Sequence, residues 1–160
     1  MPHDGQDMTL HQNPVLADLL TLTAAALPAV DDVVARAKAS VRTLVADEGR
    51  VSGKLIEANQ TAAHGFAWLA TYQQSLQQMQ NWAERLQADG KFGEVEQLIH
   101  QIAFGEYLWQ IYGGIPMSQG EIIRLQDIGL TQDDMRALML PEVMTLTQSG
   151  NTQAARMRLV

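Results

Sequence analysis

The stretch of sequence that decides the fold is HGFAWLATYQQSLQQMQNWAERLQADGKFGEVEQLIHQIAFGEYLWQIYGGIPMSQGE, from His64 to Glu121. It contains all three Trp, all three Tyr and all three Phe residues of the chain. Because aromatic side chains bury the most apolar surface per residue, we expect the core and any functional surface to centre on this stretch. Its apolar residues recur at helical spacing, and Gly113 and Gly114, followed by Pro116, predict the end of a helix.

A heptad pattern, in which apolar residues recur every seven positions, runs through the first half of this stretch and begins before it. The pattern predicts one long helix from Ser52 to Ala88, about 50 Å in length at 1.5 Å per residue. The turn formed by Asp89 and Gly90 ends it. The two series are Leu55, Ala62, Leu69, Leu76 and Ala83, and Ala58, Gly65, Tyr72, Met79 and Leu86.

A second heptad helix is predicted from Phe92 to Gly113. Gly65 in the long helix and Gly105 in this one both fall within the apolar series, although glycine inside a helix costs about 1 kcal/mol relative to alanine. We therefore expect both glycines to lie where two helices pack closely, with a local kink as the alternative. The series of this helix are Val95, Ile102 and Trp109, and Leu98, Gly105 and Tyr112.

Helical spacing continues on both sides of the stretch. A first helix is predicted from Pro14, with Asn13 as N-cap, to Glu48, with Gly49 as its C-terminal cap. Pro28 lies inside this pattern and either kinks the helix or divides it in two.

After the stretch, residues 113–130 are predicted to form a loop with one turn at 121–126. A last helix is predicted from Thr131 to Gly150, with Pro141 as the residue that could break it. Alternating apolar runs that flank a hairpin turn are not found, so no strand is predicted.

These patterns predict an all-α, up-and-down bundle of four to five helices, one of them long and heptad-patterned. The helical bundle domain is expected to span residues 14–148, because a chain of 160 residues fits one domain. Residues 1–13 are polar and are expected to be a disordered tail. Residues 149–160 are expected to be a linker that could lead to a C-terminal body outside this chain.

The composition excludes several classes of function. A net charge of −7 argues against nucleic acid or an anionic membrane as partner, because both require a basic face. The chain has no cysteine, which excludes disulfides, thiolate metal sites and cysteine nucleophiles and fits a reducing compartment. A signal-peptide pattern is not seen, and the longest near-apolar run, residues 19–30, is shorter than the roughly 20 residues that span a bilayer. We therefore expect a cytoplasmic protein.

Metal binding has little support in the sequence. A di-iron bundle requires Glu-x-x-His on two helices and a Glu on each of two others. Here Glu96 and His100 are four residues apart, and no second copy of the motif occurs. We interpret them as a pair on a helix surface, and no metal site is predicted.

Two residues are candidates for catalysis. Glu106 lies among aromatic residues, where a carboxyl group can acquire a raised pKa and act as a general acid or base. The alternative is a structural Glu106 that reaches water or a partner such as Arg85 or His64. His64 is likewise interpreted as a structural histidine. Because no phosphate-binding loop, GxGxxG motif or Ser-His-Asp order occurs, we assign no catalytic, cofactor-binding or metal residues.

Three segments carry a resemblance to a known family: HGFAWLATY (64–72), KFGE (91–94) and FGEYLWQIYGGIPMSQGE (104–121). Over roughly residues 50–130 they resemble the N-terminal helical region that precedes the dehydrogenase body in bacterial acyl-CoA dehydrogenase-like flavoproteins. QIYGG (110–114) is also similar to the QIYEG stretch of medium- and short-chain acyl-CoA dehydrogenases, in which the Glu removes the α-proton of the acyl thioester. Gly113 stands at that position here, so either the base is missing or the similarity is a coincidence.

The resemblance implies that the chain is a non-catalytic helical N-terminal domain, or a fragment, of a protein whose full-length form carries out FAD-dependent acyl-CoA oxidation. It would serve for packing against the dehydrogenase body or for self-association through its aromatic-rich helices. FAD would then be bound only where a dehydrogenase body is present, and this chain alone would be inactive. The alternatives are a stand-alone helical protein-interaction domain and an enzyme that uses Glu106 and His64.

Overall fold

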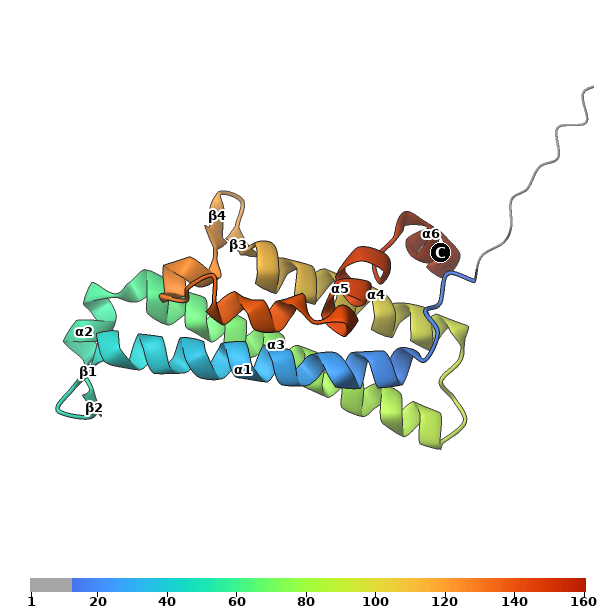
Figure 1. Ribbon diagram of the computed structural model, residues 1–160, viewed down its shortest axis with the longest axis horizontal. Helices are drawn as coiled ribbons and strands as arrows, with labels where there is room; N and C mark the ends of the chain where they lie inside the picture. Colours follow the sequence, from blue (N-terminus) through green and yellow to red (C-terminus); the bar gives the residue numbers. More distant parts are fainter. Residues whose placement is uncertain (1–12) are drawn as a thin grey trace, which may run out of the picture.

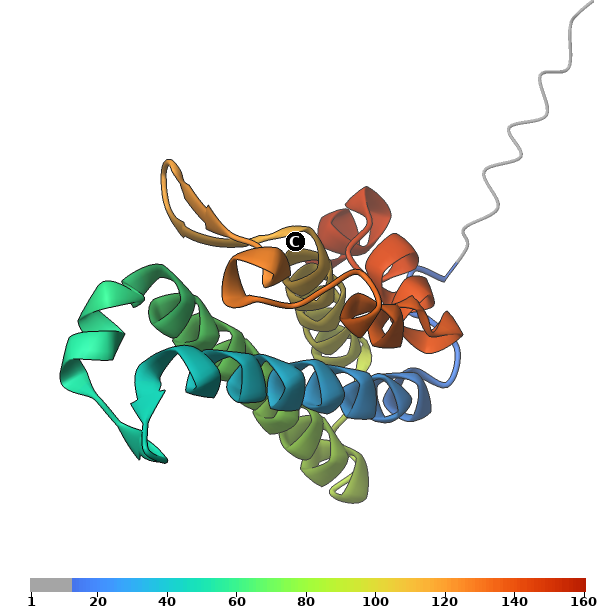
Figure 2. The same ribbon diagram turned by 60° about the vertical axis from the view of Figure 1, so that its left-hand side comes forward.

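A computed structural model describes residues 13–160, so all of the predicted tail except Asn13 lies outside the described residues. Three long helices lie side by side and run in alternating directions: α1 (Leu19–Val45), α3 (Gln60–Ala88) and α4 (Glu94–Gly113) (Figure 1). The shorter α5 (Pro141–Ser149) packs on α1 and α4, and α6 (Gln153–Leu159) packs on α4 (Figure 2). The predicted all-α fold is confirmed.

The first helix begins later than predicted and is not divided. Pro14 and Leu16 bind through their backbones to the side chain of Gln101, which holds this segment against α4 in a non-helical conformation. Pro28 lies inside α1, which continues through it. Pro28 and Ala24, whose carbonyl loses its helical partner, are both exposed, so water can replace the missing hydrogen bond.

The predicted long helix is broken at Asn59, which separates α2 (Gly53–Ala58) from α3. The side chain of Asn59 donates hydrogen bonds to the backbone oxygens of Leu55 (2.9 Å) and Leu44 (3.3 Å), and its backbone leaves the helical conformation. The side-chain bonds thus tie the end of α2 to the last turn of α1, where the chain turns at the end of the bundle. Ser52 caps α2 as predicted, because its Oγ accepts from the backbone nitrogen of Leu55.

Two small hairpins occupy segments for which no strand was predicted. In the first, β1 (Ala46–Asp47) pairs with β2 (Arg50–Val51), and both turn residues, Glu48 and Gly49, have positive φ. Gly49 therefore serves a hairpin turn and does not cap a helix. In the second hairpin, β3 (Ile115–Ser118) pairs with β4 (Glu121–Ile123), with an irregularity between Pro116 and Ser118.

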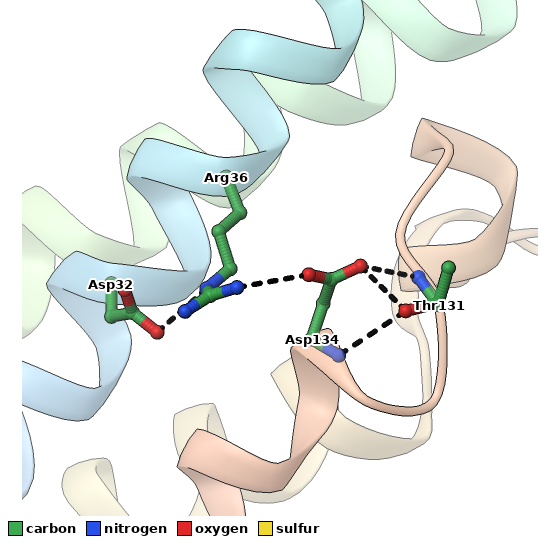
Figure 3. Close-up of polar contacts among 4 residues, drawn as sticks. All are labelled: Asp32, Arg36, Thr131 and Asp134. Atoms are coloured by element: carbon green, nitrogen blue, oxygen red, sulfur yellow. Dashed lines mark hydrogen bonds and ion pairs between the residues drawn. The ribbon is translucent and has the colours of Figure 1, made fainter.

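The segment after the second hairpin contains the 3₁₀-helices η1 (Leu125–Ile128) and η2 (Asp134–Met139). Figure 3 shows how η2 is tied to α1: Arg36 binds Asp32 (2.8 Å) and Asp134 (3.1 Å), and Asp134 accepts hydrogen bonds from the backbone and side chain of Thr131. The predicted break at Pro141 is confirmed, since Pro141 is the first residue of α5.

The C-terminal residues, which were predicted to be a linker, contain α6. Thr152 caps this helix, because its Oγ1 accepts from the backbone nitrogen of Ala155 (3.1 Å). Arg158 forms a salt bridge with Glu94 of α4 (2.7 Å), and Ala155 is fully buried. The last residues of the chain are therefore docked on the bundle.

Each predicted glycine contact involves a different partner. A Cβ on Gly105 would lie 2.8 Å from backbone atoms of Leu146 and Asn151, so α4 and the end of α5 approach closely here, as predicted. A Cβ on Gly65 would instead meet the side chain of Ile123 in β4 at 2.8 Å. The prediction of a helix–helix contact at Gly65 is therefore wrong, because the hairpin lies over that part of α3.

Candidate functional site

A buried polar cluster joins the three long helices. Thr23 of α1 donates from Oγ1 to Oε1 of Gln80 in α3 (2.6 Å), and Nε2 of His100 in α4 lies 3.0 Å from the same Oγ1. All three side chains are almost completely buried. Because the Thr23 hydrogen goes to Gln80, His100 donates from Nε2, and its Nδ1 has no partner among the residues that the structure describes.

Burial lowers the pKa of His100 to about 4, so the ring is neutral at pH 7. Phe92 and Phe104 pack against it, with ring centres 5.9 and 4.7 Å away. The predicted surface pair of Glu96 and His100 is wrong, because His100 faces the core. The cluster is inaccessible to substrate, and it specifies how the three helices fit together.

Gln101, next along α4, is a second fully buried polar residue. Its Oε1 accepts from the backbone nitrogen of Leu16 (2.7 Å), and its Nε2 donates to the backbone oxygens of Pro14 (2.9 Å) and Gly150 (3.0 Å). Glutamine is usually a surface residue, so the sequence signal for this role is the position of Gln101 at helical spacing from the buried Leu98 and Leu108.

Glu106 is held by two amide side chains. Gln110 donates to its Oε1 (2.5 Å) and Asn151 to its Oε2 (2.6 Å). The hydroxyl of Tyr72 donates to Oε1 of Gln110 (2.6 Å); burial, with the nearby Tyr107 and Glu106, raises the pKa of Tyr72 and keeps that hydroxyl protonated. The predicted partners of Glu106, Arg85 and His64, are therefore wrong.

His64 and Glu106 lie in separate surface hollows. His64 is exposed, accepts a hydrogen bond from the Trp68 indole (3.1 Å), and lines a hollow with Glu121 and α2–α3 residues. Glu106 lines another hollow with Trp109 and Asn151. The pocket that would unite both candidate residues is thus not formed. Within residues 13–160, no cluster of three or more His, Asp or Glu side chains is placed to hold a metal ion.

The outward side of α4 is apolar. Val95, Ile99 and Trp109 expose 53%, 40% and 54% of their surfaces, and Ile102 is half-buried. Together with Glu106 they form one stripe, which we call the outer face of α4. The predicted series of Val95, Ile102 and Trp109 is therefore not part of the core, which instead receives Leu98, Phe104, Leu108 and Ile111.

Two of the helix N-termini are unfavourable for the pyrophosphate of a flavin dinucleotide. A pyrophosphate commonly binds at a helix N-terminus, but the first turn of α4 carries Glu94 and Glu96, and that of α5 carries Glu142. These carboxylates repel a phosphate group. The helices within residues 13–160 also include none that is both long and apolar enough to span a bilayer.

The chain is 52% identical over 147 residues, 92% of its length, to a (2S)-methylsuccinyl-CoA dehydrogenase of Cereibacter sphaeroides. The match covers 26% of that relative, so the chain spans about a quarter of its length. No protein-family model matches the chain. The resemblance to acyl-CoA dehydrogenase-like proteins that was predicted from the sequence is confirmed.

Proposed function

We propose that the chain is the helical N-terminal domain of an acyl-CoA dehydrogenase-like protein, in which it packs against the dehydrogenase body and supplies no catalytic group. The observation that carries this proposal is the extent of the match: nearly the whole chain aligns with only a quarter of an acyl-CoA dehydrogenase. The remaining three quarters of that relative leave room for a body that binds FAD and the acyl-CoA and carries out the oxidation.

The geometry of the candidate residues supports a non-catalytic role. Both oxygens of Glu106 accept hydrogen bonds from amide groups, His64 lies in a different hollow, and His100 is buried and neutral. Gly113, which stands where the catalytic Glu of the QIYEG stretch would be, has no acidic side chain.

The proposed cytoplasmic location rests on the absence of cysteine.

A segment exchange tests this function. The matching segment of the C. sphaeroides relative is replaced by this chain, and the relative without the segment serves as control. We expect the exchanged enzyme to retain FAD and to oxidise (2S)-methylsuccinyl-CoA, and the isolated chain to do neither. A soluble exchanged protein without FAD or activity, or flavin binding by the isolated chain, would contradict the proposal.

The second candidate is a free-standing interaction domain that associates with copies of itself. The exposure of Trp109 favours it, because a large exposed aromatic side chain often marks an interface. Sedimentation velocity separates the two functions: a stable dimer of the isolated chain at micromolar concentration supports the second, and a monomer supports the first.

A further inference from the structure

Helix α4 carries apolar residues on two opposite sides. One side enters the core through Leu98, Phe104 and Leu108, and the opposite side is the outer face with Val95 and Trp109. A surface helix usually buries one apolar stripe and exposes a polar side, so a second, exposed apolar stripe is unusual. By contrast, the exposed side of α3 is polar and forms an ordinary solvated surface. Its exposed positions include Gln74, Gln78, Asn81, Glu84 and Arg85.

The outer face of α4 is also a rigid surface. Its helix is fixed by α3 on one side and by α5 and α6 on another. The close packing of Gly105 on the end of α5 fixes its orientation, and the exposed salt bridge between Glu94 and Arg158 adds little to this. Single exposed apolar residues are common, but several on successive turns of one fixed helix form a patch of the kind that partners bind.

We infer that the outer face of α4 is the surface on which the dehydrogenase body packs; this inference rests on the proposed function. A second copy of the chain is the competing occupant, and labelling at several concentrations separates the two. The relative supplies another occupant, since three quarters of its length lies outside the match.

Cysteine labelling tests the inference, because the chain has no cysteine of its own. Val95→Cys introduces a thiol on the outer face, and Val51→Cys, at a residue 65% exposed in the first hairpin, is the matched control. Each variant is made in the isolated chain and in the exchanged enzyme, treated with a maleimide, and quantified by peptide mass spectrometry. If the exchanged protein is insoluble, the cysteines are placed at the aligned positions of the relative itself.

In the isolated chain we expect both thiols to react quickly at all concentrations. In the exchanged enzyme we expect Val95→Cys to react at least about tenfold more slowly and Val51→Cys to react as before, since reaction requires an accessible thiolate. Equal rates at residue 95 in both proteins, while the exchanged enzyme keeps FAD and activity, would overturn the inference and leave the proposed function standing. If labelling of Val95→Cys in the isolated chain becomes slower as the protein concentration rises, the inference is overturned, because a second copy of the chain then covers the outer face.

Discussion

Gly105 of α4 and Gly150 at the end of α5 pack backbone against backbone, so that a Cβ on Gly150 would lie 3.2 Å from the Cα of Gly105. The contact is reinforced by the hydrogen bond from Gln101 Nε2 to the carbonyl oxygen of Gly150 (3.0 Å). Because backbone atoms cannot rotate away as side chains do, this contact sets the distance between the two helices and with it the position of the outer face of α4.

The two glycines predicted from the heptad pattern should differ in sensitivity. Gly105→Leu should lower the free energy of unfolding by at least about 1–3 kcal/mol, because its side chain would overlap backbone atoms of Leu146 and Asn151. Gly65→Ala should cost less, because its Cβ meets the side chain of Ile123 and no backbone atom. Gly113→Ala, which meets nothing within 4 Å, is the control. Equal melting temperatures for the Gly105→Leu and Gly113→Ala variants would show the close contact to be unimportant.

Removal of the Gln101 side chain should loosen the N-terminal segment. Gln101→Ala leaves polar groups of Leu16, Pro14 and Gly150 without their partner, and each buried group left unpaired costs about 1–3 kcal/mol. We expect a lower melting temperature and faster hydrogen exchange at residues 15–20. Gln97→Ala, which removes one hydrogen bond to the backbone of Phe92, is the control. Unchanged exchange in the Gln101→Ala variant would refute the assigned role.

Protonation of His100 should destabilise the fold in mild acid. The folded state lowers the pKa of His100 from 6.5 to about 4, so the unfolded chain takes up a proton first as the pH falls. The stabilisation that comes from a neutral His100 is therefore fully present above pH 6.5 and is lost as the pH falls from 6.5 to 4. It amounts to about 3 kcal/mol in total. Urea unfolding between pH 7.5 and 4 should show a steeper loss in the wild type than in the His100→Gln variant. Parallel curves would mean that His100 does not titrate as described.

The link between η2 and α1 should depend on Asp134 more than on Arg36. The backbone hydrogen bond from Thr131, followed by its side chain and Arg36, lowers the pKa of Asp134, so this contribution is lost only when the pH falls below the usual aspartate range. Asp134→Ala removes the two hydrogen bonds from Thr131 and the ion pair, whereas Arg36→Ala removes only exposed ion pairs, which contribute little. Hydrogen exchange at residues 131–139 should accelerate clearly in the Asp134→Ala variant and less in the Arg36→Ala variant. Equal acceleration in both variants would contradict the larger role of Asp134.

The sequence predicted the long helices because each buries apolar residues at three- and four-residue steps. It did not predict which side of α4 is buried, because Val95 and Leu98 are equally apolar and both fit a heptad series. The hairpin at Glu48 and Gly49 has strands of two residues, which are too short to show alternation. The cluster around His100 depends on residues from three helices, whose meeting cannot be derived from spacing along any one of them.

If the dehydrogenase body covers the outer face of α4, that face stabilises the larger enzyme and not the isolated domain. The decisive measurement is the melting temperature of the double variant Val95→Lys and Trp109→Lys, in the isolated chain and in the exchanged enzyme. We predict almost no change in the isolated chain, since substitutions of exposed residues usually alter stability by no more than about 0.5 kcal/mol. In the exchanged enzyme we predict a clearly lower melting temperature and loss of FAD. Equal changes in the two proteins, or an exchanged enzyme that is unaffected, would contradict the claim.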